Sequence, residues 1–96
     1  MLYMVIERFK NRDAQAVYSR FKEKGRMLPG GLRYVVSWTE TNFDRCFQMM
    51  ECDDPRLFEQ WIEQWTDLAE FELVPVMTSA AAAAAALRDQ PPAGDL

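Results

Sequence analysis

The sequence predicts an α+β protein with ferredoxin-like βαββαβ order, in which a four-stranded antiparallel sheet carries two helices on one face. Two observations predict this class. Segments of β-forming residues alternate along the chain with segments whose apolar residues recur at helical spacing. The 96 residues, 49% of them apolar and 12% aromatic, are enough for one globular domain with its own core.

The first strand and the first helix are predicted within residues 2–25. Residues 2–9 are rich in β-formers and are apolar on both faces up to Glu7. Asn11 or Asp13 is placed to cap a helix, and Gly25 is a natural stop for it. The buried stripe of this helix is expected to consist of Ala14, Val17, Tyr18 and Phe21.

A hairpin is predicted next, after a turn at Pro29-Gly30-Gly31. Residues 32–41 alternate, which predicts a second strand with Leu32, Tyr34, Val36 and Trp38 on one face. A turn at residues 41–42 leads into a third strand over residues 45–52. Cys46 and Cys52 would lie roughly 20 Å apart along that strand, so we expect two reduced thiols rather than a disulfide.

A helix rich in tryptophan follows this hairpin. Asp54-Pro55 is a typical helix start, because the carboxylate caps free N–H groups and proline is tolerated in the first turn. Trp61 and Trp65 lie one turn apart, so this helix needs a broad apolar partner. Its charges are mostly acidic and those around the first helix mostly basic, so the two helices are expected to pair them.

The chain ends with a strand and an extension. The last strand is predicted over residues 71–77, with Pro75 placing it at a sheet edge. Ser79 is expected to cap the run Ala80–Ala86, a helix too short and too apolar to be stable alone. We therefore divide the chain into a domain over residues 1–79 and an alanine-rich helical extension with a flexible tail over residues 80–96.

The sheet has more apolar surface than two helices can cover. Helices on one side should leave a polar outer face on the strands, yet both sets of alternating positions are apolar. A second copy of the chain is therefore expected to cover the open face, giving a homodimer. Its apolar residues are drawn from Met4, Ile6, Phe47, Met49, Val74 and Val76.

Composition excludes several classes of function. The net charge of −4 and the pI of about 4.7 argue against a nucleic-acid partner. The chain has no histidine and no cysteine spacing typical of a metal site, so we expect neither a metal nor a cofactor. No apolar run has membrane-spanning length and no leader pattern is present, so we expect a cytoplasmic protein without a membrane partner.

Several segments together resemble a family of small bacterial proteins that has no assigned activity. The resemblance covers roughly residues 1–79 and is carried in order by residues 1–9, 25–29, 31–35, 37–38, 45–51, the Trp61/Trp65 helix and 71–76. That family is similar to the dimeric α+β-barrel superfamily, in which two ferredoxin-like subunits close their sheets face to face. The resemblance thus implies a dimeric barrel and leaves the function open.

The aromatic residues suggest a ligand site. We predict a pocket for a small apolar or aromatic molecule, lined by Tyr34, Trp38, Gln48, Trp61 and Trp65. Some relatives in the resembled superfamily use cofactor-free pockets of this kind, which implies a monooxygenase or isomerase acting on a small aromatic compound as the alternative function. The structural explanation is that the tryptophans form the core, with their indole N–H groups bonded locally.

Two further interpretations stay open. Glu7, Arg45 and Glu51 interrupt apolar strands. A buried carboxylate beside an arginine is then a proton-transfer site, an inter-subunit ion pair or a group at a strand end in water. RNA-recognition modules share this topology, and Tyr3 and Phe47 lie where such modules place aromatic residues. The acidic net charge and the glycine-poor third strand argue against RNA. Whether the protein is an enzyme stays undecided at this point.

Overall fold

A single antiparallel sheet organises the computed structural model, which describes residues 1–88. The strands lie in the order β2-β3-β1-β4, with β1 and β3 in the centre. The elements in chain order are β1 (Leu2–Phe9), a short 3-10 turn (Lys10–Arg12), α1 (Ala14–Lys24), β2 (Arg33–Thr39), β3 (Arg45–Glu51), α2 (Leu57–Glu63), β4 (Ala69–Val76) and α3 (Ser79–Leu87). The predicted α+β class is confirmed.

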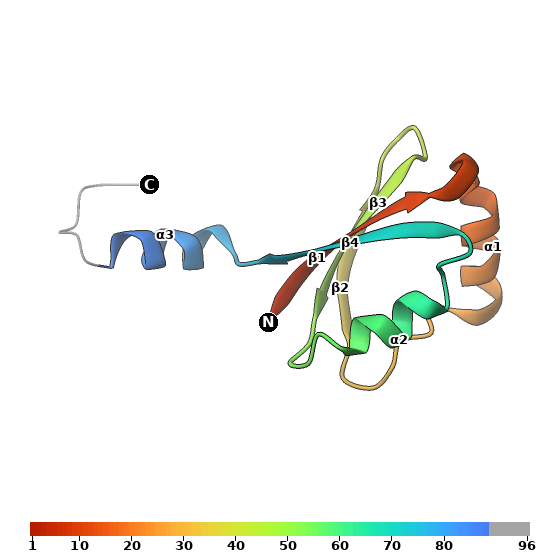
Figure 1. Ribbon diagram of the computed structural model, residues 1–96. Helices are drawn as coiled ribbons and strands as arrows, with labels where there is room; N and C mark the ends of the chain where they lie inside the picture. Colours follow the sequence, from red (N-terminus) through yellow and green to blue (C-terminus); the bar gives the residue numbers. More distant parts are fainter. Residues whose placement is uncertain (89–96) are drawn as a thin grey trace.

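The connections are those of a split βαβ arrangement. β1 and β2 both pair antiparallel with β3, and they therefore run parallel to each other with β3 between them. In the same way β3 and β4 run parallel on either side of β1. α1 and α2 each cross between one of these parallel pairs, and both lie on the same side of the sheet (Figure 1).

Strand register divides the side chains between two faces. Tyr3, Val5, Glu7 and Phe9 of β1 are buried on the face toward the helices, which we call the helix face. On β3 the alternate positions Cys46, Gln48 and Met50 are buried on the same face. The other face carries no helix within the described residues, and we call it the open face (Figure 1). Its apolar side chains are Leu2, Met4, Ile6, Val36, Trp38, Phe47, Met49, Val74 and Val76.

A β-bulge changes the predicted alternation of β2. Tyr34 pairs with Met50, but the next register pair joins Val36 to Met49, so the pairing shifts between Tyr34 and Val36. The inserted residue moves every later side chain of β2 to the opposite face. Tyr34 therefore lies on the helix face, whereas Val36 and Trp38 lie on the open face. The prediction that these three residues share one face was wrong.

The core is a chain of aromatic rings in edge-to-face contact. Phe58 contacts Tyr3 at 5.1 Å between ring centroids, and Trp61 contacts Phe58 at 6.4 Å and Phe71 at 5.5 Å. Such contacts add to the stabilisation from burial. The indole N–H groups of Trp61 and Trp65 both donate to the carbonyl oxygen of Arg26, at 2.9 and 3.2 Å. These bonds satisfy both indoles and join α2 to the segment between α1 and β2.

The tryptophan helix is shorter than predicted. α2 begins at Leu57 and ends at Glu63, so Trp65 lies in the turns that follow it. The flanking turns are held by bonds of the i→i+3 type, including Leu57 N to Asp54 O and Trp65 N to Ile62 O. The Asp54 carboxylate does accept from a backbone N–H of this segment, that of Arg56, at 3.0 Å.

The predicted ends of α1 are confirmed, and the predicted cap of α3 was wrong. The Asp13 carboxylate accepts from Ala16 N at 3.1 Å, and Gly25, with φ of 69°, ends α1. The cap of α3 is Thr78 rather than Ser79, because the Thr78 hydroxyl accepts from Ala81 N at 3.1 Å. α3 projects away from the sheet with no buried residue (Figure 1). The predicted tail from Gln90 lies outside the described residues.

An ion pair links α1 to the segment that follows α2, as predicted from the opposite charges of the two helices. The Arg20 guanidinium of α1 donates two hydrogen bonds of 2.7 Å to the Asp67 carboxylate beyond α2. It also lies 5.7 Å from the centre of the Trp65 ring.

Pro75 lies on β4, at one edge of the sheet, and Cys46 and Cys52 are both free and buried. No helix within residues 1–88 has the length and hydropathy required to cross a membrane.

The aromatic core yields a first prediction. Trp61 is 1% exposed, so replacing it by alanine should lower the free energy of unfolding by roughly 3–5 kcal/mol, the usual cost of such a cavity. Phe43→Ala is the control, because Phe43 is 57% exposed in the β2–β3 loop. Denaturant unfolding of both variants checks the difference, and similar midpoints for the two would contradict it.

Candidate functional site

A cavity lies between the helix face of the sheet and the two helices. Its volume is about 70 Å³, and it is partly open to solvent. The lining combines aromatic rings with a few polar groups, as ligand sites in proteins usually do. It consists of Glu7, Phe9, Val17, Tyr18, Phe21, Arg26, Ser37, Gln48, Trp61 and Trp65.

Glu7 and Gln48 are the buried polar pair in this cavity. Glu7 is 6% exposed and Gln48 is 7% exposed. They are diagonal neighbours on the central strands, since Glu7 pairs with Cys46 and Gln48 pairs with Val5. The Gln48 amide N–H donates to the Glu7 carboxylate. The Gln48 carbonyl oxygen is buried and has no hydrogen-bond partner among the described residues.

Burial controls the ionisation of Glu7. Desolvation raises the pKa of the Glu7 carboxyl from 4.5 to about 7, although the Gln48 hydrogen bond and the Arg26 charge act in the opposite direction. The neighbouring Cys46 thiol has a pKa raised to about 11 by burial, and it therefore stays protonated at neutral pH. A carboxyl that titrates near neutrality inside a cavity is suited to exchanging a proton with a bound molecule.

Arg26 contributes two different groups to the site. Its backbone carbonyl accepts both indole N–H groups, and its guanidinium lies 3.5 Å from the Tyr34 ring centre and 4.8 Å from that of Phe21. The backbone on either side has positive φ, 69° at Gly25 and 59° at Met27. Positive φ at a methionine is unfavourable, so strain at this turn accompanies the position of Arg26.

The structure brings together four of the five predicted ligand residues. Gln48, Trp61 and Trp65 line the cavity directly. Tyr34 lies on the same face, supports the Arg26 guanidinium and shares a 2.7 Å hydrogen bond with the Ser37 hydroxyl. Trp38 is not part of this group. The bulge in β2 places it on the open face, where it is 53% exposed.

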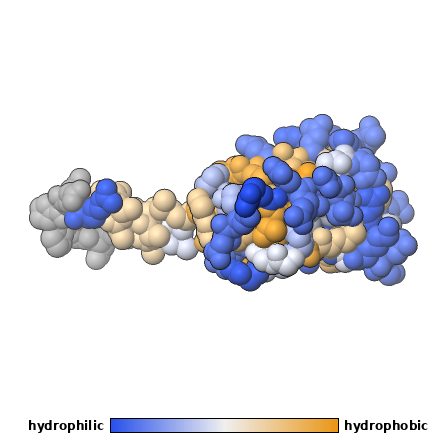
Figure 2. Space-filling view, turned by 60° about the horizontal axis from the view of Figure 1, so that its bottom comes forward, coloured by the Kyte–Doolittle hydropathy of each residue, from blue (hydrophilic) through white to orange (hydrophobic). Residues whose placement is uncertain are grey.

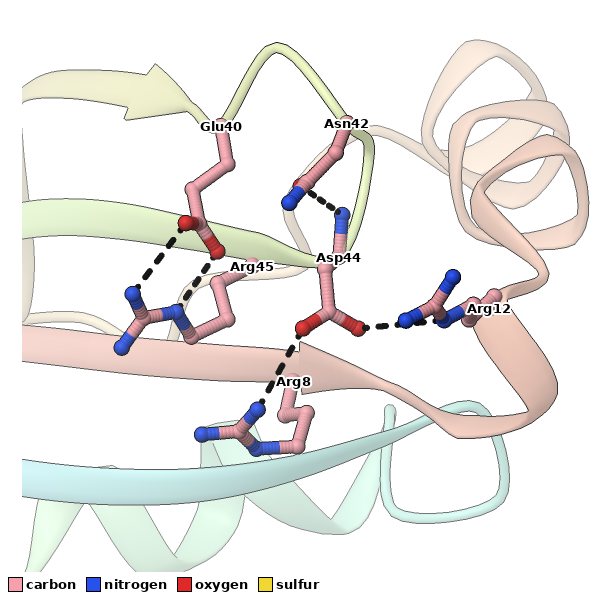
Figure 3. Close-up of polar contacts among 6 residues, drawn as sticks. All are labelled: Arg8, Arg12, Glu40, Asn42, Asp44 and Arg45. Atoms are coloured by element: carbon pink, nitrogen blue, oxygen red, sulfur yellow. Dashed lines mark hydrogen bonds and ion pairs between the residues drawn. The ribbon is translucent and has the colours of Figure 1, made fainter.

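Glu7, Arg45 and Glu51 do not form one site. Glu7 faces the helices, whereas the parity of β3 places Arg45 and Glu51 on the open face. The Arg45 guanidinium pairs with the Glu40 carboxylate at 2.6 Å, and the Glu51 carboxylate pairs with Arg33 at 2.6 Å (Figure 3 shows the first pair). Arg45 and Glu51 thus lie at the two ends of β3 in ion pairs within the chain, and neither is placed beside Glu7.

Figure 3 shows the polar cluster at the hairpin end of the open face. The Asp44 carboxylate forms ion pairs with the guanidinium groups of Arg8, at 3.4 Å, and Arg12, at 3.9 Å. The Asn42 side-chain oxygen accepts a hydrogen bond from the Asp44 backbone N–H. Because the Arg8 and Arg12 side chains are largely exposed, each pair contributes little to stability. Within residues 1–88 no three histidine, cysteine, aspartate or glutamate side chains are grouped so as to hold a metal ion.

Sequence reasoning missed part of the cavity wall. The prediction that Tyr18 and Phe21 belong to a buried stripe of α1 was wrong, because they are 42% and 38% exposed and line the cavity. Arg26 is not among the predicted site residues. Glu7 carried a signal, because it is a charged residue at an alternating position of β1 between the apolar residues Val5 and Phe9. Arg26 carried none, since its position depends on the backbone turn after Gly25.

The comparisons with known proteins add a family. Over residues 1–90 the chain matches the family described as Domain of unknown function (DUF3303). No curated protein matches the chain.

The raised pKa of Glu7 makes stability depend on pH. The folded state holds this proton more tightly than the unfolded state, so the stabilisation is complete below about pH 4.5 and is lost as the pH rises toward about 7. The loss should be on the order of 3 kcal/mol. Glu7→Gln should remove most of it, which chemical denaturation between pH 5 and 8 would measure. Glu63→Gln, on the exposed side of α2, is the control, and equal pH profiles for wild type and Glu7→Gln would contradict the assignment.

Proposed function

We propose that this chain, which belongs to the DUF3303 family, is a homodimeric α+β-barrel protein that binds a small apolar or aromatic ligand in the cavity between its helices and its sheet. The observation that carries the ligand part is the cavity itself. It is partly open, walled by tryptophan and phenylalanine rings, and contains a buried carbonyl oxygen that nothing in the described chain satisfies. A tightly filled aromatic core would have favoured a purely structural role.

The open face supports the dimer. Nine apolar side chains gather there on all four strands, and Met4 of β1 pairs directly with Met49 of β3 at its centre. Ion pairs lie toward the margins of the same face, Arg45 with Glu40 at one end and Arg33 with Glu51 at the other. An apolar centre with a polar rim is the usual composition of a specific interface.

The proposed dimer contact has a minimum size. A specific interface buries at least about 1,000 Å² in total, which is roughly 500 Å² on each partner. Figure 2 shows that the side of the body seen in that view has an apolar area among hydrophilic residues, and that α3 projects from this body. Two copies that met through their open faces would form the barrel.

A second candidate function is cofactor-independent oxidation or isomerisation of a small aromatic compound. It is favoured by Glu7, a buried carboxyl that is half ionised near neutral pH and lines the cavity. Such a group can accept a proton from a bound compound and return it at another position. This function uses the same cavity and the same ligand class.

The dimer makes a specific prediction. Wild-type protein should have the mass of two chains by light scattering at micromolar concentration and should keep it in high salt, because the contact is apolar. Met49→Asp should give a monomer or an aggregate, since the substitution buries a charge in the interface. Phe43→Asp changes an exposed aromatic residue outside the open face and should stay dimeric. A wild-type monomer of 11.2 kDa over a wide concentration range would refute the barrel.

Ligand binding is tested by filling the cavity. Val17 lines it and is buried, so Val17→Phe should occupy the space that a ligand needs. We expect phenol or benzoate to bind the wild type saturably by calorimetry and not to bind Val17→Phe. Val35→Phe, at a half-exposed position of β2, should bind as the wild type does. Absence of saturable binding by every ring compound would contradict the proposed function.

A further inference from the structure

Some polar groups of the cavity already form hydrogen bonds within the chain, and others do not. The indole N–H groups of Trp61 and Trp65 are bound to the Arg26 carbonyl oxygen. The Tyr18 hydroxyl is bonded to Thr39 at 2.5 Å and the Ser37 hydroxyl to Tyr34. The two indole donors are therefore occupied, and each of the two hydroxyls already has one hydrogen-bond partner within the chain. What is left for a ligand is one buried acceptor region and one cationic group.

The acceptor region is formed by Gln48 and Glu7. Gln48 is more than nine-tenths buried and lines the cavity, and its carbonyl oxygen has no donor within residues 1–88. Its amide N–H is already directed to the Glu7 carboxylate, which fixes the carbonyl oxygen as the free end. A buried acceptor without a partner is costly, so this position favours a ligand that brings an O–H or N–H donor.

The cationic group is the Arg26 guanidinium. Arg8, Arg20, Arg33 and Arg45 each form an ion pair with a carboxylate, whereas the Arg26 guanidinium has no hydrogen bond or ion pair to any residue in the described part of the chain. It is instead stacked on the rings of Tyr34 and Phe21 at the cavity wall. Stacking holds the planar fork in one orientation while its N–H donors stay available, and this geometry suits a carboxylate.

We propose that the cavity binds a small hydroxylated ring carboxylate, with the ligand carboxylate on the Arg26 guanidinium and the ligand hydroxyl donating to the Gln48 carbonyl oxygen beside Glu7. This inference rests on the ligand-binding function proposed above and names the class of ligand. The cavity is small, about 70 Å³, and partly open to solvent, so it limits the ligand to a single ring that stays partly outside it. A phosphate dianion fits less well, because its second charge would lie near the Glu7 carboxylate.

The test compares three compounds with matched groups: 3-hydroxybenzoate, benzoate and phenol. Calorimetry should give 3-hydroxybenzoate at least about tenfold tighter binding than either of the others, since each lacks one of the two polar contacts. Arg26→Gln should weaken 3-hydroxybenzoate and benzoate by about tenfold and leave phenol unchanged. Gln48→Met should weaken 3-hydroxybenzoate and phenol and leave benzoate unchanged.

Controls separate this inference from the function on which it rests. Lys24→Gln removes the same charge from an exposed position at the end of α1 and should change none of the three affinities. Arg26→Gln keeps the backbone carbonyl that binds both indoles, so circular dichroism should show a folded protein. Equal affinities for phenol and 3-hydroxybenzoate would overturn the ligand class and leave cavity binding intact. No binding of any ring compound would overturn both.

Discussion

The carbonyl oxygen of Arg26 is the point on which the helical layer depends. It accepts the indole N–H of Trp61 from α2 and that of Trp65 from the turn beyond, so one backbone atom satisfies both indoles. A buried indole without an acceptor would cost as much as other unsatisfied polar groups, and within residues 1–88 no other acceptor is bonded to either ring. The tryptophans can therefore be buried only if the segment after α1 adopts its unusual backbone conformation, with positive φ at Gly25 and Met27. The same conformation places the Arg26 side chain on Tyr34 at the cavity wall, so core and site share one constraint.

Much of the fold could be predicted because periodicity and end signals act locally. Alternation in β1 and β3, the Asp13 cap, the Gly25 stop and the edge position of Pro75 all follow from residue type and spacing. The bulge in β2 could not be predicted. Nothing in Tyr34-Val35-Val36 distinguishes a bulged from a regular strand, because the shift is decided by how β2 registers against β3. One extra residue there sends Trp38 to the face opposite Tyr34.

The candidate site was predictable to the extent that its residues lie on regular elements. Gln48 on β3 and Trp61 on α2 follow from strand and helix spacing, and the structure places both at the cavity. Glu7 was noticed as an interruption of an apolar strand, but its partner is an amide and not the arginine that sequence reasoning considered. Arg26 lies outside any regular element, in a turn whose dihedral angles depend on tertiary contacts. Local sequence rules therefore do not predict that the Arg26 guanidinium lies at the site.

Both margins of the sheet are poor templates for another strand. β2, at one margin, is interrupted by its bulge, and β4, at the other, contains Pro75, which has no N–H to donate, with Glu70 and Glu72 exposed on the same strand. Strand-by-strand extension into an open-ended fibril is thereby disfavoured at each side, even though the chain is rich in β-forming apolar residues. A two-fold contact between the same sheet face of two copies uses neither margin, and it closes after two copies.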